Sequence, residues 1–197
     1  MNIVDVGYRS THYYILADTR PRLLVDAGWP GTLSTMRHTC SRMGIQLERI
    51  PYQLATHYHI DHAGLAQELK QLGVRLIVID TQLAAIPLMS RHVKPRDNYT
   101  EIQLEGNTVL SAAESRAFLA GIGIQGEIIS IPGHSDDSVT LILDEGIAFT
   151  GDLTSPLRVP DDPADLAYQS WQAIRAKGVH TIYPAHGPSW QLETLVK

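Results

Sequence analysis

A histidine-rich segment that directly follows a predicted strand constrains this chain more than any other feature of its sequence. The segment has the form H-x-H-x-D-H over residues 57–62, and the strand is predicted over Pro51–Thr56. Because side chains alternate along a strand, His57 and His59 are expected to project to the same side. The chain is then expected to turn into a helix, which would bring the aspartate and the third histidine to a neighbouring position. Three imidazoles and a carboxylate form a ligand set that suits zinc and also accepts iron or manganese.

Three further motifs follow predicted strands and carry the same kinds of side chain. They are PGHS at 132–135, TGD at 150–152 and PAHG at 184–187. Taken alone, each histidine is more often a capping or hydrogen-bonded residue, and the aspartate more often a turn residue. Ligands collected from loops at strand ends are, however, how a rigid scaffold builds a site. We therefore interpret the joint pattern as a metal centre, with a solvated histidine-rich loop as the alternative for the first segment.

The order of the predicted elements indicates two sheets with helices outside them. Strands cluster in each half of the chain, and a helix precedes each new group, which is typical of an α/β fold with an αββα four-layer sandwich. Ser111 and Glu114 have the spacing of a capping box at the start of a helix. The predicted strands are Asn2–Tyr8, Thr11–Ala17, Arg22–Asp26, Pro51–Thr56, Leu76–Asp80, Glu127–Ile131, Ser138–Leu143, Ile147–Thr150 and Thr181–Tyr183. The predicted helices are Thr32–Met43, Ala63–Leu72, Gln82–Arg91, Ser111–Ala120 and Pro163–Ala176.

The composition indicates an ordinary globular protein. Of the 197 residues 44% are hydrophobic and 19% charged, which excludes general disorder, and we expect one domain over residues 1–197. Sixteen basic residues against 21 acidic ones give a net charge of −5, so nucleic acid is not an expected partner. The apolar runs are too short to span a membrane and the first residues do not form a signal peptide, so we expect a cytoplasmic protein without a membrane partner. No feature indicates an oligomeric state.

With these motifs the chain resembles the metallo-β-lactamase superfamily, whose αββα fold agrees with the predicted order of elements. The resemblance rests on LVDAG at 24–28, HYHIDH at 57–62 and the three later motifs, and it extends from residue 24 to residue 187. It implies a site for two divalent metal ions. The implied ligands are His57, His59 and His134 for one metal and Asp61, His62 and His186 for the other, with Asp152 bridging both together with a water or hydroxide. Asp26 would orient ligands through hydrogen bonds, or it is simply a turn residue at a strand end.

The resemblance also implies hydrolysis. Two close divalent ions, most simply zinc, lower the pKa of a bridging water and polarise the bond that breaks, so a hydroxide nucleophile is supplied near neutral pH. Asp61 is the group that we expect to take up the released proton, which makes it the predicted catalytic residue. No serine or cysteine nucleophile is needed, and the single cysteine, Cys40, lies on a predicted helix away from the motifs.

Differences from other branches of the superfamily narrow the expected substrate. Asp152 stands where true metallo-β-lactamases usually have a non-acidic residue. The motif set is similar to that of glyoxalase II, but the sequence ends eleven residues after His186, without the helical domain that follows there. We therefore expect a hydrolase of a small ester, thioester or lactone. A mononuclear iron oxidoreductase similar to persulfide dioxygenases, a phosphodiesterase or nuclease of the same fold, and an inactive binding module are the alternatives.

A basic run lies in the long interval between His62 and His134. It contains Arg91, Lys94 and Arg96. Such a run is either a solvated face or part of a pocket wall that would favour an anionic small-molecule substrate.

Overall fold

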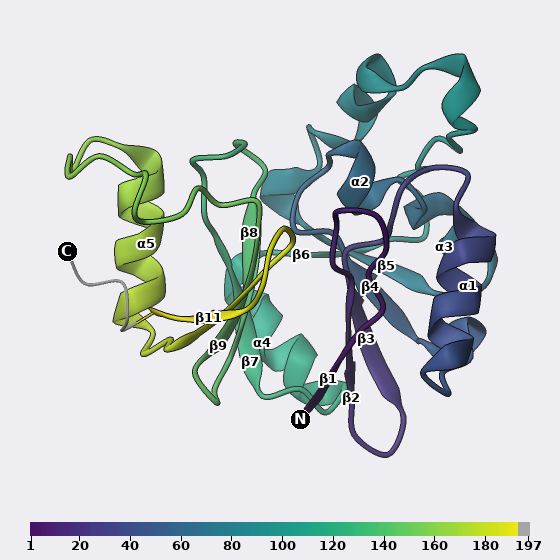
Figure 1. Ribbon diagram of the computed structural model, residues 1–197, viewed down its shortest axis with the longest axis horizontal. Coiled ribbons are helices and arrows are strands. Elements are labelled where there is room, and N and C mark those ends of the chain that lie inside the picture. The colour runs from purple at the N-terminus through teal and green to yellow at the C-terminus, as the bar shows by residue number, and fades with distance from the viewer. Residues whose placement is uncertain (193–197) are drawn as a thin grey trace.

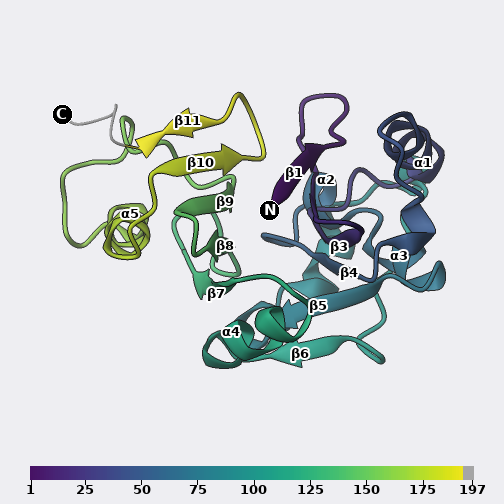
Figure 2. The ribbon, with the colours of Figure 1, turned by 90° about the horizontal axis from the view of Figure 1, so that it is seen from below.

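Two β-sheets pack face to face, and helices lie on their outer sides (Figures 1 and 2). The structure is a computed structural model, and it describes residues 1–192. The first sheet has the strand order β1-β2-β3-β4-β5-β6 and the second β11-β10-β9-β8-β7. The strands of the first sheet are β1 (Asn2–Asp5), β2 (Tyr14–Ala17), β3 (Pro21–Val25), β4 (Tyr52–Leu54), β5 (Arg75–Ile79) and β6 (Thr108–Leu110). Those of the second are β7 (Gly126–Ser130), β8 (Val139–Leu143), β9 (Ile147–Gly151), β10 (Thr181–Pro184) and β11 (Trp190–Gln191).

The helices cover the sheets on both sides and at one edge. The α-helices are α1 (Leu33–Arg42), α2 (Ile60–Ala63), α3 (Ala66–Gln71), α4 (Ala112–Gly121) and α5 (Leu166–Ala176). Helices α1 and α3 lie outside the first sheet, α5 lies outside the second, and α4 lies where β6 and β7 approach each other (Figure 2). The 3₁₀ helices are η1 (Leu47–Arg49), η2 (Asp80–Gln82), η3 (Ile86–His92) and η4 (Pro95–Asp97). This arrangement is the predicted αββα sandwich.

Four apolar clusters lie among the described residues, and three of them hold the layers together as follows. The central cluster joins the inner faces of the two sheets, where Leu54 and Ile77 meet Leu141 and Phe149. A second cluster packs α1 and α3 against the first sheet, and a third packs α5 against the second sheet through Trp171. Every residue of β8 is buried, as expected for a strand covered on both faces. The loops at the strand ends are therefore carried by a rigid framework.

Two of the predicted helices differ from the structure. The predicted helix Ala63–Leu72 is shortened to α3 (Ala66–Gln71) and separated from α2, which ends at Ala63, because the amide of Leu65 donates to the carbonyl of Ala27 in a neighbouring loop. The predicted helix Gln82–Arg91 is wrong, since this segment forms the 3₁₀ helices η2 and η3. The side chain of Gln82 donates to the carbonyls of Ala55 and Asp137, which ties the segment to the site and prevents a regular helix.

The other elements follow the prediction with small shifts. The capping box of Ser111 and Glu114 is present at the start of α4. Helix α5 begins later than predicted, at Leu166, because the Asp165 side chain accepts a hydrogen bond from the Tyr168 amide and caps it there. The short strands β6 and β11 were not predicted. Within the described part of the chain, no helix is long and apolar enough to cross a membrane.

Candidate metal centre

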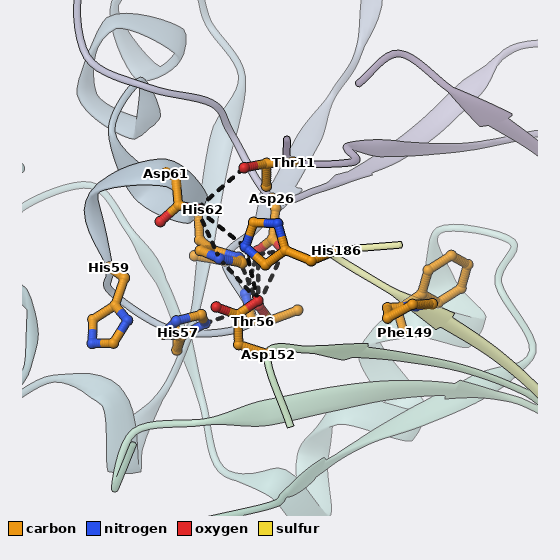
Figure 3. A network of polar contacts seen from close by, with 12 residues as sticks. Thr11, Asp26, Thr56, His57, His59, Asp61, His62, Phe149, Asp152 and His186 are labelled. Atoms are coloured by element: carbon orange, nitrogen blue, oxygen red, sulfur yellow. Dashed lines mark hydrogen bonds and ion pairs between the residues drawn. The ribbon is translucent and has the colours of Figure 1, made fainter. Parts of the chain in front are cut away.

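The seven predicted ligands lie close together in one cluster. All of them except His134 are labelled in Figure 3. Four of them belong to the segment after β4 in the first sheet, where His59 precedes the first turn of α2. The other three follow strands of the second sheet: His134 comes after β7, Asp152 after β9 and His186 after β10. Sequence segments separated by more than a hundred residues therefore contribute side chains to one cluster, and the cluster lies between the two halves of the fold.

The ligand atoms form two groups that match the two implied metal sites. In each group these atoms lie within 4.8 Å of one another. We call them the first set (His57, His59 and His134) and the second set (Asp61, His62 and His186). Within the first set, His59 Nδ1 lies 3.1 Å from His134 Nε2. Within the second, Asp61 Oδ2 lies 3.3 Å from His186 Nε2.

Asp152 lies between the two sets. Its Oδ1 atom is 3.3 Å from Nε2 of both His62 and His186, and its Oδ2 atom is 3.6 Å from His134 Nε2. Asp152 also forms a third group of close ligand atoms with His57 and His62. One carboxylate thus contacts members of both sets, as expected of a residue that bridges them.

Buried polar atoms of the cluster fit divalent cations. His57 Nε2 is buried and makes no hydrogen bond among the described residues. His62 Nε2 and Asp152 Oδ1 are also buried without a hydrogen bond, although they lie 3.3 Å apart as an ion pair. An unsatisfied buried polar atom destabilises a fold by about 1–3 kcal/mol, and a bound cation removes that penalty. Imidazole nitrogens and carboxylate oxygens are also ligands that zinc, iron and manganese accept. The chemistry and the missing hydrogen bonds therefore point to the same occupant.

Asp26 supports the cluster through hydrogen bonds to Thr56 and His62. It is buried, and its carboxylate accepts hydrogen bonds from the Thr56 amide at 2.7 Å, the Thr56 hydroxyl at 3.0 Å and His62 Nδ1 at 2.9 Å. The bond from Nδ1 directs Nε2 of His62 into the site, where a ligand nitrogen is required. The backbone of Asp26 has φ of +62°, a conformation uncommon outside glycine, and the three hydrogen bonds hold it there. The hydrogen bond from His62 that the predicted orienting role of Asp26 requires is present.

Some positioning contacts could not be found from the motifs. His186 Nδ1 donates to the carbonyl of Ser10, and the Thr11 hydroxyl donates to Asp61 Oδ2 at 3.1 Å. Asp137 accepts a hydrogen bond from the Tyr58 amide between the first two histidines. Ser10 and Thr11 lie in the loop between β1 and β2, far from the motifs in sequence, and a backbone carbonyl leaves no residue-type signal. Asp137, by contrast, lies two residues after the PGHS motif. Its closeness to that motif in the sequence could have indicated that it lies near the cluster.

The electrostatics of the cluster differ between its histidines. Burial and the neighbouring imidazoles hold the pKa of His57 well below its usual value, so this side chain is neutral and able to bind a cation. Burial also lowers the pKa of His62, but the carboxylates of Asp26 and Asp152 outweigh it and raise that pKa to about 10. His62 therefore has to release a proton when a cation binds. Burial raises the pKa of Asp152, but the contact with His62 lowers it more. The pKa of Asp152 therefore lies below the usual value of an aspartate.

One hollow is lined by residues of the cluster, and a second lies near α2. One, of about 500 Å³, is lined by His134, Asp152 and His186 together with residues of the second half of the chain. The other, of about 490 Å³, is lined by Ile60 of α2 and by basic residues that include Lys94 and Arg96. Of the three residues in the predicted basic run, Lys94 and Arg96 line this hollow and Arg91 does not.

Comparison with known proteins agrees with this geometry. A Caenorhabditis elegans protein described as a beta-lactamase-like protein 2 homolog is 28% identical over 190 residues, which cover 91% of this chain and 57% of that protein. The chain thus spans little more than half of that relative. A metallo-beta-lactamase family protein from Thermus thermophilus superposes with a TM-score of 0.73 at 17% identity, covering 96% of this chain and 74% of that one.

A second solved structure matches along almost its whole length. This protein, solved in a di-iron-bound form, superposes with a TM-score of 0.71 at 21% identity, covering 98% of this chain and 96% of that one. At such identities the solved structures establish the shared fold. The family model of the metallo-beta-lactamase superfamily matches residues 6–186, which include all seven residues of the cluster. The chain belongs to the metallo-beta-lactamase superfamily.

Proposed function

We propose that the chain is a hydrolase that uses two divalent metal ions, zinc in the first instance, to cleave a small ester, thioester or lactone. The observation that carries the proposal is the position of Asp152, which contacts His134 of the first set and His62 and His186 of the second. Two ligand groups that share one carboxylate are suited to two neighbouring cations, because the shared negative charge reduces the repulsion between them. The seven proposed metal ligands are His57, His59, Asp61, His62, His134, Asp152 and His186.

The proposed reaction adds water across the acyl C–O or C–S bond, which breaks to give a carboxylic acid and an alcohol or thiol. When bound, the metal pair would supply an activated water near neutral pH and polarise the acyl oxygen. Asp61 is the proposed proton acceptor, because it is partly exposed at the cluster and the Thr11 hydroxyl orients its Oδ2 atom. Asp26 keeps His62 in the orientation that the site requires.

A small-molecule substrate is supported by shape and charge. A hollow of about 500 Å³ lies within the range of small-molecule pockets, and three of the proposed ligands line it. The net charge of −5 opposes a polyanionic substrate, which needs several phosphate contacts. Lys94 and Arg96 line the second hollow, which contains none of the seven proposed ligands, so they are not placed at the proposed reacting centre.

The identity of the metal has a second candidate. The similar protein that was solved with two iron ions matches this chain over almost its full length. The same histidine and carboxylate ligands serve both metals, so iron is the alternative to zinc. Metal analysis of protein purified without chelators, from cultures supplied with each metal, should give about two equivalents of one of them.

A substrate panel tests the reaction class. Fully metallated protein should hydrolyse small acyl esters, thioesters or lactones faster than β-lactams, RNA or DNA. Asp61→Ala is the control for hydrolysis by adventitious metal, because it lacks both a proposed ligand and the proposed proton acceptor. Efficient cleavage of a structured RNA, with all the small acyl compounds inert, would show that the proposed substrate class is wrong.

A further inference from the structure

The hollow beside the cluster has an apolar wall. His134, Asp152 and His186 line it, so both ligand sets and the carboxylate between them face the same space. Leu153, Trp171 and Trp190 line the same hollow. A substrate group placed in this hollow would therefore contact both the proposed reacting centre and apolar side chains. This is the usual composition of a small-molecule site.

The apolar wall is held in place by the fold. Trp171 on α5 is buried, and its indole Nε1 donates to the carbonyl of Thr154 at 2.8 Å, two residues after Asp152. The ring of Trp190 lies 5.7 Å from that of Trp171, and its backbone pairs with Ile182 in the second sheet. Trp190 is partly exposed and lines the hollow. The wall is thus anchored to α5 and to β11, and Trp190 is its accessible part.

One cation lines the same hollow. Arg158 is exposed, its amide donates to the carbonyl of Ser155 at 2.8 Å, and its side chain forms no ion pair with any residue up to position 192. Among the described residues, the only acidic one that lines the hollow is Asp152, at the metal centre. An arginine without a carboxylate partner beside an apolar wall is a ready site for an anionic group, since its planar guanidinium matches a carboxylate.

We propose that this hollow binds the acyl part of the substrate, and that the substrate is an acyl compound with an apolar chain and a carboxylate at its far end. Resting on the hydrolase proposed above, this inference names the substrate class of the same site. The apolar chain packs against Trp190 and Leu153, and Arg158 binds the far carboxylate. Arg158 and Trp190 are thus specificity residues and take no part in the bond cleavage.

Binding of two uncleaved compounds tests the role of Arg158. Octanamide and suberamic acid have the same eight-carbon chain and the same amide end, but only suberamic acid has a carboxylate at the far end. Arg158→Gln should weaken suberamic acid about tenfold, the usual effect of losing a charge-assisted hydrogen bond, and leave octanamide unchanged. Isothermal titration calorimetry on zinc-loaded protein measures both affinities. Arg175→Gln, on the exposed last turn of α5 and outside the hollow, is the matched control.

The apolar wall is tested in the same titrations. Trp190→Ala should weaken both compounds, and Trp190→Phe should restore most of the affinity because it keeps an aromatic surface. Lys94→Gln and Arg96→Gln, in the second hollow, should have no effect on either compound. The inference is overturned if Arg158→Gln weakens both compounds equally or neither, if Trp190→Ala weakens neither, or if the Lys94 and Arg96 variants are the ones that lose suberamic acid.

Failure of this inference can be told apart from failure of the proposed hydrolase. Neither compound has to be cleaved, so the titrations report on the hollow even if no ester, thioester or lactone is hydrolysed. Conversely, hydrolysis of neutral short-chain esters with no effect of the Arg158 and Trp190 variants would support the proposed reaction and reject the proposed acyl site.

Discussion

At the scale of single residues, the site depends on which atoms are left without protein partners. Asp26 satisfies Nδ1 of His62, and the carbonyl of Ser10 satisfies Nδ1 of His186. The opposite nitrogens of these two rings both face Asp152. A histidine fixed on one side by a hydrogen bond holds its other nitrogen in a defined position, which is the arrangement that a metal ligand requires once that nitrogen has lost its proton. The protein therefore builds the site mainly by arranging hydrogen bonds around it.

Asp152→Ala is the first residue-scale prediction. It removes the carboxylate that contacts both sets, so two cations would face each other with less negative charge between them. We expect loss of at least one metal equivalent and of most activity, with the fold retained because the apolar clusters hold the sheets. Metal analysis and circular dichroism of the purified variant measure these two effects. Retention of two metal equivalents with full turnover would show that Asp152 is not the bridge.

Asp26→Asn tests the support behind the ligands. The amide keeps an oxygen that can accept from Thr56, but it loses the charge and one of the two acceptor atoms that now serve Thr56 and His62. Loss of such a supporting contact typically lowers metal affinity about 10–100-fold, and we expect a loss of this size. Competition with a chromophoric zinc chelator measures the affinity. An unchanged affinity would mean that the hydrogen bond to His62 does not orient the ligand.

At the scale of elements, local patterns predicted the strands and their order much better than they predicted the segments around the site. The first histidines, Asp61 and the later motifs were recognisable because each is a short run of sequence next to an apolar strand. The break between α2 and α3 could not be recognised in the sequence, because it depends on Gly64 packing against Pro30 and on the hydrogen bond from Leu65 to Ala27. Gln82 likewise makes its contacts with residues far away in the sequence.

Gly64→Ala tests this packing. A methyl group at Gly64 would clash with the carbonyl of Ile60 and the ring of Pro30, and would lie 2.6 Å from the carbonyl of Gly28. We expect a destabilisation of about 1–3 kcal/mol in urea unfolding, typical of overpacking, together with weaker metal binding because α2 carries Asp61 and His62.

Gly121→Ala is the matched control for that substitution. Gly121 lies in α4, and a methyl group there meets no atom within 4 Å. Replacement of a helical glycine by alanine usually stabilises by about 0.5–1 kcal/mol, so this variant should be as stable as the parent chain or slightly more stable. If both variants unfold at the same urea concentration, the tight packing of Gly64 does not matter to stability.

At the scale of the whole molecule, the cluster joins the two sheets, but contacts within the protein already align them. The Val139 amide donates to the Thr56 carbonyl at 2.8 Å, next to the ligands from both halves. The hydroxyl of Tyr14 donates to the carbonyl of Pro184 at 2.8 Å, which links β2 to β10 just before His186. These bonds and the central apolar cluster do not require metal. Metal removal should therefore lower the stability of the fold without abolishing it.

Zinc titration of the chelator-treated protein tests this coupling. Because the ligands come from both sheets, unfolding separates them, and a cation that binds only the folded chain stabilises it by mass action. At a free zinc concentration of about 100 times the dissociation constant, this stabilisation is about 2.7 kcal/mol per site. For a chain of this size each kcal/mol raises the melting temperature by about 2–4 °C, so one occupied site should add roughly 5–11 °C.

The titration also distinguishes two sites from one. Calorimetric binding to the chelator-treated protein should saturate at about two equivalents of zinc, and each bound ion should raise the melting temperature further. Asp152→Ala, titrated in parallel, should saturate earlier and show a smaller rise, because it lacks the carboxylate placed between the two sets. Saturation of the parent chain at one equivalent, with the whole rise in melting temperature already reached, would rule out the proposed metal pair and leave a single site supplied by both sheets.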